Sequence, residues 1–213
     1  MEKEIQKKIF DAYLKLQDKF SIENSQWRKW CRENKTEQEK FEVIVEAILT
    51  QRTNWKNVEK AMDNLKEEMI LEIKKFFETL KNDKEKIINL IKPAGFKNQK
   101  AIYLYNLFDY IFEQYQGSLF KMETENHFKL RQDLLKINGI GPETADSILL
   151  YAFSKPVFVI DEYTRRFVRK YKISQEKNYY KLQNIFEENL PPDWRLYQKF
   201  HALIVIAGKE KFF

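Results

Sequence analysis

A Gly-Ile-Gly-Pro run at 139–142 constrains the fold of this chain more than any other stretch, because a helix cannot pass through it cheaply. Glycine in a helix interior costs about 1 kcal/mol and proline about 3 kcal/mol, whereas both suit a turn and the start of a new helix. Apolar residues recur at helical spacing on both sides of the run. The sequence therefore predicts a helix at 126–137, a tight turn at 138–141 and a second helix at 142–153.

The predicted turn has the chemistry of a phosphate-binding site. Backbone N–H groups in the first turn of a helix bind anions, and a residue without a side chain lets a phosphate approach the backbone closely. Contacts of this kind hold a nucleic-acid strand without reading its sequence. We therefore expect phosphate contacts from Gly139, Ile140 and Gly141.

Helical periodicity continues through nearly all of the 213 residues, and no stretch alternates convincingly as a strand would. We therefore expect an all-α protein, with a buried helix from Phe41 to about Thr50 and with Phe10, Phe41 and Phe153 in the core. A polar stretch that carries two tryptophans occupies 21–38. Further helices are predicted at 3–20, 54–67, 69–80, 83–91, 98–115, 161–171, 177–187 and 193–207.

Composition limits the classes of function. Lys and Arg number 38 against 32 Asp and Glu, a net charge of +6 that suits a polyanionic partner but also fits an ordinary surface. Cys31 is the single cysteine, which excludes an internal disulfide and any multi-cysteine metal site, and His127 and His201 are too isolated to form one. There is no long apolar run and no signal peptide, so we expect a cytosolic protein that makes no contact with a membrane.

The stretch 134–161 resembles the helix-hairpin-helix and aspartate signature of the DNA glycosylase superfamily that includes endonuclease III. The family hairpin reads roughly L-P-G-[VI]-G-x-[K/other]-[TS]-A, and the essential aspartate follows the variable position by 18 residues. Here Glu143 takes the variable position, Asp161 lies 18 residues later, and Asn138 replaces the usual proline. The residues that match the hairpin are Leu135, Gly139, Ile140, Gly141, Thr144 and Ala145.

The resemblance implies two helical lobes with a DNA cleft between them, one formed by 27–155 and the other by 1–26 with 156–213. It also implies a monomer that binds damaged double-stranded DNA in the cytoplasm, associated with the nucleoid. The stretch 200–212 resembles the helix that leads into the four-cysteine iron–sulfur cluster of endonuclease III. With a single cysteine no such cluster can form, so no cofactor is expected, although a monovalent cation that bridges hairpin carbonyls to phosphate would suit the family.

Asp161 is the expected catalytic residue. Cleavage of an N-glycosidic bond passes through an oxocarbenium-like sugar, which a nearby carboxylate stabilises. Asp161 follows the apolar run VFVI and precedes a predicted helix, so its local sequence also fits a simple helix cap. The family spacing favours the catalytic role, and Asp161 can serve as a cap as well.

Glu143 bears on the type of reaction. Family members that also cut the DNA strand carry a lysine at this position, and the lysine amine attacks the sugar to form a Schiff base. A glutamate cannot do this, so we expect a monofunctional glycosylase that leaves an abasic site. Two alternatives stay open: an endonuclease III-like glycosylase and lyase that acts on oxidised bases through another lysine, and a non-catalytic DNA-binding hairpin protein.

Tryptophans indicate the class of base. Trp27, Trp30 and Trp55 are candidates for a pocket that receives a flipped nucleotide, because indole rings stack well on cationic bases such as 3-methyladenine. In this respect the chain resembles the 3-methyladenine branch of the superfamily, which also lacks the lysine and the cluster. The alternative for each tryptophan is ordinary packing. Gln51, in a stretch that resembles the family's lobe junction, is the candidate wedge that fills the gap left by the flipped base.

Several basic residues complete the expected DNA surface. Lys136, Arg165 and Arg166 are candidate phosphate contacts, with solvent exposure as the alternative for each. Lys209 is a candidate for a modified lysine, or for one that supports Asp161 through a neighbour, with exposure on the surface as the default. The stretch 93–101 resembles a glycine turn of the family, in which Gly95 would end one helix and Asn98 would cap the next.

Overall fold

The computed structural model describes residues 2–23 and 25–213, and every regular element among them is helical, which confirms the all-α prediction. A 3-10 turn (η1, Lys92–Ala94) and a π-helical turn (η2, Ile148–Ala152) accompany the α-helices. The α-helices are α1 (Glu2–Lys19), α2 (Trp27–Trp30), α3 (Glu37–Leu49), α4 (Trp55–Glu67), α5 (Ile73–Asn82), α6 (Lys84–Leu90), α7 (Lys97–Tyr115), α8 (Leu119–Glu123), α9 (His127–Lys136), α10 (Pro142–Ser147), α11 (Glu162–Lys170), α12 (Tyr179–Asn189) and α13 (Trp194–Lys209).

The chain divides into two compact units. The first joins the two ends of the chain, Met1–Glu33 and Leu149–Phe213, and the second is the continuous middle, Asn34–Ile148. The boundaries that we expected from the sequence, before residue 27 and after residue 155, both lie inside the first unit. As a result Trp27 and Trp30 belong to the unit that contains Asp161, not to the unit that contains the glycine turn.

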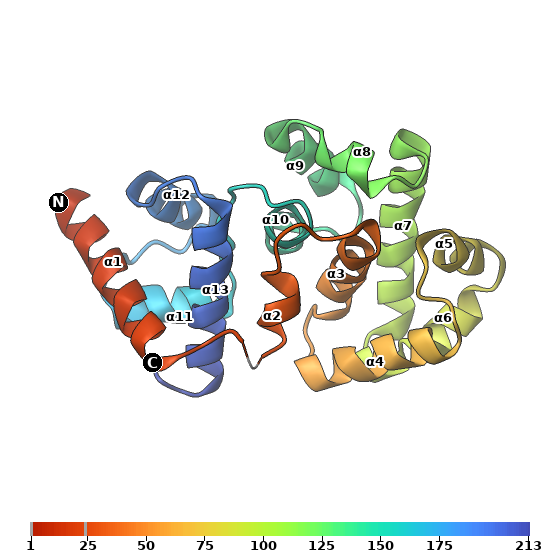
Figure 1. The fold of residues 1–213 in the computed structure, drawn as a ribbon, viewed down its shortest axis with the longest axis horizontal. Helices are drawn as coiled ribbons and strands as arrows, with labels where there is room; N and C mark the ends of the chain where they lie inside the picture. Colours follow the sequence, from red (N-terminus) through yellow and green to blue (C-terminus); the bar gives the residue numbers. More distant parts are fainter. Residues whose placement is uncertain (1, 24) are drawn as a thin grey trace. The chain divides into compact units, whose positions relative to one another are not determined.

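Helix α3 is the centre of the second unit, where it packs against α4, α7, α8 and α10 (Figure 1). Thr36 starts the helix with a capping box that it forms with Glu39. Phe41 of α3, Phe76 of α5 and Phe108 of α7 are fully buried and meet edge to face, with ring centroids 5.3 to 5.5 Å apart. This aromatic core fixes the N-terminal half of α3 against α5 and α7.

Helix α13 has the same role in the first unit, where it packs against α1 and α11 (Figure 1). Phe200 of α13 contacts Phe167 of α11 edge to face, with centroids 5.6 Å apart. Phe158 stacks on Phe186 of α12 with a centroid distance of 4.2 Å. These rings hold the segment that leads to Asp161 against α13.

The structure corrects several details of the helices predicted from sequence. The helix predicted at 69–80 begins later, at Ile73, because Met69 has a φ of +53°, which ends the preceding helix. The helix predicted at 142–153 changes to π-helical geometry after Ser147. Helices α2 and α8 lie in stretches where no helix was predicted. Phe41 and Phe153 are buried as expected, whereas Phe10 is 50% exposed.

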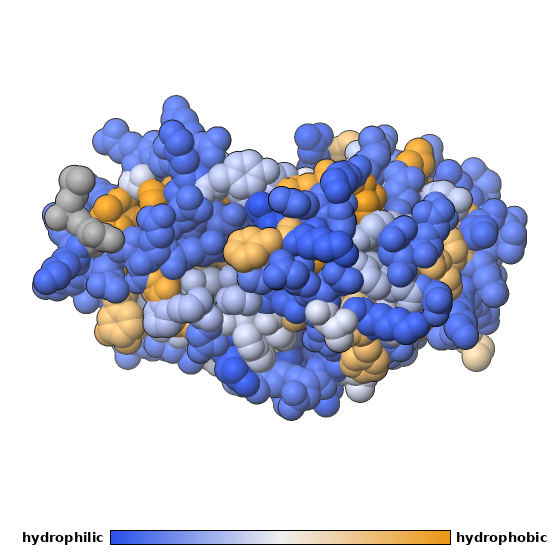
Figure 2. All heavy atoms as spheres, turned by 90° about the horizontal axis from the view of Figure 1, so that it is seen from above, coloured by the Kyte–Doolittle hydropathy of each residue, from blue (hydrophilic) through white to orange (hydrophobic). Residues whose placement is uncertain are grey.

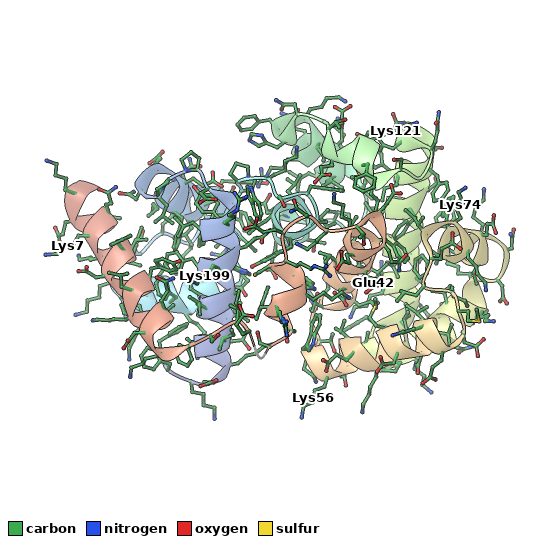
Figure 3. The ribbon with its side chains drawn as sticks, in the orientation of Figure 1. Lys7, Glu42, Lys56, Lys74, Lys121 and Lys199 are labelled. Carbon is green, nitrogen blue, oxygen red and sulfur yellow. The ribbon has the colours of Figure 1, made fainter. Side chains whose placement is uncertain are left out.

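The surface is predominantly polar. Figure 2 shows one face on which hydrophilic side chains prevail and apolar residues appear in separate patches. Lysines project from their helices into solvent, among them Lys7, Lys56, Lys74 and Lys121 (Figure 3). Within the described residues, no helix has the length and apolar character needed to cross a membrane.

Candidate functional site

The glycine turn joins α9 to α10 as a helical hairpin, and its two glycines have different structural reasons to be glycine. Gly139 has a φ of +99°, and a Cβ built on it would lie 2.0 Å from a ring carbon of Tyr103. Gly141 has an ordinary φ of −86° and precedes Pro142, the first residue of α10, and a Cβ there would meet no atom within 4 Å. Folding therefore requires glycine at 139 but not at 141.

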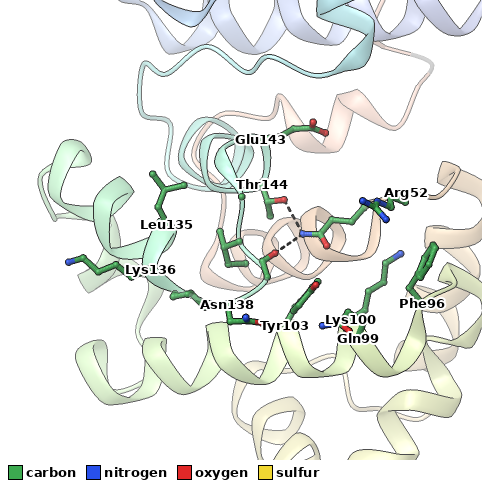
Figure 4. Close-up of a pocket in the computed structure, with 15 residues that line it drawn as sticks. Arg52, Phe96, Gln99, Lys100, Tyr103, Leu135, Lys136, Asn138, Glu143 and Thr144 are labelled. Carbon is green, nitrogen blue, oxygen red and sulfur yellow. Dashed lines mark hydrogen bonds between the residues drawn. The ribbon is translucent and has the colours of Figure 1, made fainter. Parts of the chain in front are cut away.

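Two amide side chains from outside the hairpin hold its backbone. The Nε2 of Gln51 donates to the carbonyl oxygen of Gly139 at 3.0 Å and to the Oγ1 of Thr144 at 3.0 Å (Figure 4). The Nδ2 of Asn106, on α7, donates to the carbonyl oxygen of Asn138 at 3.2 Å. The turn is therefore held rigid although Asn138 stands where the family has proline.

A pocket of about 730 Å³ opens beside the hairpin in the second unit. In Figure 4, Arg52, Lys100 and Phe96 lie on one side of the pocket, and Leu135 and Lys136 lie on the other. The other lining residues are Gln51, Gln99, Tyr103, Ile137, Asn138, Gly139, Ile140, Gly141, Glu143 and Thr144. The predicted phosphate-binding turn thus forms part of the wall of a concave surface that carries basic side chains.

Within the turn, the amides are not equivalent as anion donors. The N–H of Ile140 donates to the carbonyl oxygen of Ile137 at 3.0 Å, and the side chain of Ile140 is buried. The turn therefore uses the Ile140 amide internally, which leaves the amides of Gly139 and Gly141 as the donors that could meet a phosphate.

Lys100 is a buried lysine at this pocket. Its Nζ donates to the carbonyl oxygens of Leu49 and Ala94, each at 2.8 Å, and the residue is only 1% exposed. Burial lowers the pKa of Lys100 to about 8. Because Leu49 ends α3 and Ala94 ends η1, this ammonium ties the segment that carries Gln51 to the turn before α7.

Phe96 is a candidate contact residue that the sequence reasoning missed. It is 62% exposed, with a φ of +46°, and it precedes α7 at the pocket. The expectation that Asn98 caps this helix is wrong, because α7 begins at Lys97 and Asn98 lies within its first turn. The signal available in the sequence was an aromatic residue directly after Gly95, in a stretch where a chain reversal was already predicted.

A buried ion pair joins the two helices of the hairpin. Arg131 of α9 donates to both carboxylate oxygens of Asp146 of α10, with Nε–Oδ1 at 2.6 Å and Nη2–Oδ2 at 2.9 Å. The Asp146 side chain is fully buried and that of Arg131 is 18% exposed. Two parallel charge-assisted bonds fix the relative orientation of the helices on either side of the turn.

Asp161 lies in the first unit at the start of α11, and the structure confirms that it caps this helix. Its Oδ1 accepts from the amide of Thr164 at 2.7 Å, while its Oδ2 lies 3.7 Å from the Nε2 of His201, with the Asp161 side chain 15% exposed. Burial by itself would raise the pKa of the carboxyl group, but His201 and Thr164 outweigh burial and lower this pKa below the usual aspartate value. The site therefore presents an ionised carboxylate that is nearly removed from water.

An aromatic cluster surrounds His201 beside this carboxylate. Trp27 and Trp30 are both buried, with ring centroids 5.5 Å apart. Trp27 lies edge-on to His201 at 5.6 Å, and both indoles lie within 5.3 Å of the Tyr151 ring. Sequence reasoning considered His201 only as a metal ligand, because nothing local in the sequence places it near Asp161.

Trp55 and Glu143 lie in the second unit. Trp55 is the first residue of α4 and is partly exposed, so it is not in the same compact unit as Trp27, Trp30 and Asp161. Glu143 lies exposed in the first turn of α10 and lines the hairpin pocket. The roles predicted for these residues, and the wedge role of Gln51, stay predictions.

Each of the predicted basic residues already has a partner in the protein. Lys136 donates to Asp133 at 2.8 Å at the end of α9. Arg165 donates to the carbonyl oxygen of Lys177 at 2.6 Å, Arg166 to that of Phe213 at 3.0 Å, and Lys209 to the side chain of Gln26 at 3.3 Å. Among the described residues, no group of three or more His, Cys, Asp and Glu could hold a metal ion.

Comparison with known proteins shows sequence similarity along most of the chain. Residues 45–192 match the family described as HhH-GPD superfamily base excision DNA repair protein. A Methanocaldococcus jannaschii protein that bears the provisional name of a DNA repair glycosylase is 45% identical over 199 residues, which are 92% of this chain and 85% of that protein. An endonuclease III of Thermotoga maritima is 30% identical over 134 residues, which are 62% of this chain and 57% of that enzyme.

Solved structures share the fold. The 3-methyladenine DNA glycosylase of H. pylori (MagIII), bound to 1,N6-ethenoadenine, matches with a TM-score of 0.81 and 31% identity, covering 95% of this chain and 98% of that one. An endonuclease III trapped in a covalent intermediate with DNA matches with a TM-score of 0.73 and 15% identity, covering 99% and 87%. At that identity the second match shows the fold alone.

The two hairpin glycines generate a paired prediction. Gly141→Ala should change the free energy of unfolding by less than about 1 kcal/mol, because the backbone and the space suit alanine. It should nevertheless weaken binding to duplex DNA by about tenfold, or about 1.4 kcal/mol, because the new methyl group blocks close approach of a phosphate. Fluorescence anisotropy with a labelled duplex measures the affinity, and unchanged affinity would contradict the phosphate contact.

Gly139→Ala is the matched variant for that test. It should destabilise the fold by about 2 kcal/mol or more, because alanine at positive φ is strained and meets the Tyr103 ring. Urea denaturation of both variants separates the two effects. A Gly139→Ala protein as stable as the wild type would show that the turn does not require glycine at this position.

The ion pair within the hairpin predicts a difference between two residues on α9. Arg131→Met should lower the free energy of unfolding by about 3 kcal/mol, because it leaves the Asp146 carboxylate buried without its guanidinium. Lys129→Met, which removes an exposed pair with Glu125 at 2.8 Å, should cost less than about 1 kcal/mol. Equal losses in urea denaturation would show that the buried pair does not hold the hairpin together.

Proposed function

The chain belongs to the HhH-GPD superfamily of base excision DNA repair proteins, and from that premise we propose that it is a monofunctional DNA glycosylase that excises alkylated purines and leaves an abasic site. Family membership confirms the resemblance found in the hairpin and supports a DNA glycosylase of base excision repair. The observation that carries the proposal is Asp161, an ionised carboxylate that is almost buried and lies beside an aromatic cluster.

Asp161 supplies the electrostatic part of the reaction. As the glycosidic bond breaks, positive charge develops on the sugar, and a fixed carboxylate stabilises that charge most where water is excluded. The Thr164 amide holds one carboxylate oxygen in place, which limits how far the group must reorganise during the reaction. Water then attacks the sugar and the departing base leaves an abasic site.

The absence of a lysine at position 143 supports base release without strand cleavage. A Schiff base requires an amine, and Glu143 has none. Lys100 has the lowered pKa that a nucleophilic lysine needs, but its ammonium is buried and donates to two backbone carbonyls. This arrangement favours a structural role for Lys100 over attack on a sugar.

An alkylated purine is the substrate class that the aromatic cluster favours. A purine alkylated on the ring, such as 3-methyladenine, is cationic, and a cation gains about 0.5 to 2 kcal/mol from contact with an aromatic face. Trp27 and Trp30 lie in the same unit as Asp161 and are buried around His201 and Tyr151, which supports a role beside that carboxylate. The similarity to MagIII, named as a 3-methyladenine glycosylase, points in the same direction.

Contacts with DNA in this proposal come chiefly from the backbone. The amides of Gly139 and Gly141 bind a phosphate, and Lys136, Arg165 and Arg166 add positive charge. Gln51 fills the gap left by the flipped base, for which it releases its bonds to Gly139 and Thr144. A monovalent cation could share the hairpin carbonyls of Asn138 and Gly139, since each accepts one protein donor and has a second lone pair. The protein acts as a cytoplasmic monomer on damaged double-stranded DNA and needs no iron–sulfur cluster.

Asp161→Asn tests the proposed function directly. Asparagine keeps the helix cap but loses the charge, so release of methylated purines should fall by at least about 100-fold while binding to an abasic duplex stays unchanged. In the wild type, the rate of base release should fall only at pH values below the ordinary pKa of an aspartate, because the pKa of Asp161 is lowered. A variant that releases bases at the wild-type rate would leave only DNA binding as the function.

The cation-stacking role of Trp27 predicts a substrate-dependent loss. Trp27→Phe keeps an aromatic ring but contacts cations more weakly, so excision of cationic methylpurines should fall about three- to tenfold. Excision of neutral hypoxanthine should change less. Trp194→Phe, at the start of α13, is the control and should affect neither substrate. Equal losses on cationic and neutral bases would contradict a role in recognising charge.

A further inference from the structure

We propose that His201 is a positioning residue that holds the Asp161 carboxylate in its reactive orientation, with Tyr151 fixing the imidazole tautomer. This inference rests on the function proposed above and identifies a residue of the same site. The three residues come from α13, the N-terminus of α11 and the π-helical turn η2, so that three elements meet at one carboxylate.

The geometry places the imidazole between a hydroxyl group and a carboxylate. The Oη of Tyr151 lies 2.7 Å from Nδ1 of His201, and Nε2 lies 3.7 Å from Oδ2 of Asp161. The other carboxylate oxygen accepts from the Thr164 amide at 2.7 Å. One oxygen is thus held by the helix that Asp161 caps, and the second faces a ring nitrogen on the neighbouring helix.

Hydrogen-bond chemistry selects the ring nitrogen that carries a proton in either form of the imidazole. A bare Nε2 would place a lone pair opposite the lone pairs of an anionic carboxylate, which is unfavourable. A proton on Nε2 is therefore favoured in both the neutral and the cationic ring. In the neutral ring, Nδ1 then accepts a hydrogen bond from the Tyr151 hydroxyl. In the cationic ring, Nδ1 donates to the Tyr151 oxygen instead. The hydroxyl then donates to the carbonyl oxygen of Gln198, which lies 3.3 Å away.

The contact between His201 and Asp161 is longer than a hydrogen bond. At 3.7 Å it is too long for a hydrogen bond, and Nε2 is buried without a hydrogen-bond partner. A buried donor without an acceptor lowers stability, and the Asp161 carboxylate is an anionic acceptor close to Nε2. A shift of under one ångström would bring Nε2 within hydrogen-bond distance of Oδ2.

The surroundings keep the imidazole in place. Trp27 packs edge-on against the His201 ring, and Trp30 packs on Tyr151. The Tyr151 hydroxyl of η2 lies beside the imidazole, and its own charged neighbours are Asp161 and the Cys31 thiol, which follows α2. Burial raises the pKa of Tyr151 well above its ordinary value, and the charges of Cys31 and Asp161 add to this effect, so the hydroxyl stays protonated. The enclosure also excludes water, which strengthens the effect of His201 on Asp161.

Two substitutions of His201 separate positioning from packing. His201→Gln can place an amide nitrogen near the position of Nε2, whereas His201→Asn is too short to reach Asp161. In single-turnover release of methylpurines, His201→Asn should lose about 100-fold, because a carboxylate displaced by about an ångström costs that much. His201→Gln should recover most of the rate, with affinity for an abasic duplex unchanged in both variants. Equal losses in the two variants, accompanied by weaker DNA binding, would show that His201 only fills the core.

The pKa of Asp161 gives a readout that does not depend on activity. Because His201 lowers this pKa in the wild type, it should rise in His201→Asn, as followed by carbon NMR of the Asp161 carboxyl group in the protein without DNA. The acid limb of the rate profile should move to higher pH in parallel. An unchanged pKa overturns the positioning role, even if the wild type excises no methylpurine and the proposed function fails.

Tyr151→Phe provides the test if the His201 variants do not fold. It keeps the buried ring and removes only the hydroxyl group that fixes the tautomer. Base release should fall about tenfold, as for the loss of a group that orients a reactive residue. Combined with His201→Gln, it should have no further effect. A wild-type rate in Tyr151→Phe would contradict the role of Tyr151, and a full additive loss in the double variant would contradict its action through His201.

Discussion

The ionised state of Asp161 is the constraint on which the first unit depends. A carboxylate that is only 15% exposed would take up a proton if burial acted alone. The Thr164 amide and His201 reverse that tendency, and each requires a particular arrangement. Asp161 must cap α11, and α13 must lie against α11. The pairing of the two chain ends in one unit supplies this arrangement. It also gathers Trp27, Trp30 and Tyr151 around the same histidine, so that charge and aromatic surface occur together.

In the proposed function, the second unit has a different task, which is to hold a backbone turn rigid enough to bind phosphate. Gly139 allows the turn to form, and Gly141 keeps its surface open. Gln51 and Asn106 hold the carbonyls, and the buried pair of Arg131 and Asp146 fixes the flanking helices. Since none of these contacts reads a base, the hairpin suits an enzyme that must grip any DNA sequence and select its target by chemistry at Asp161.

The features that could be predicted from the sequence are those governed by local chemistry. The glycine turn, the helix after Pro142 and the cap at Asp161 follow from residues adjacent in the chain. His201 lies 40 positions from Asp161 in the sequence, and only the packing of α11 on α13 brings them together. Trp27 and Trp30 looked like part of a polar loop because a four-residue helix gives no clear periodicity. Phe96 was missed because a phenylalanine at positive φ contradicts the local preference of the residue.

The central claim is that Asp161 drives base release by water without a covalent amine, and incubation with methylated duplex DNA tests it most directly. The products should be free methylpurine bases and strands that break only after treatment with alkali, with no protein–DNA adduct trapped by borohydride. Strand breaks without alkali together with a trapped adduct would contradict the account, because they would show that a lysine attacks the sugar in spite of Glu143.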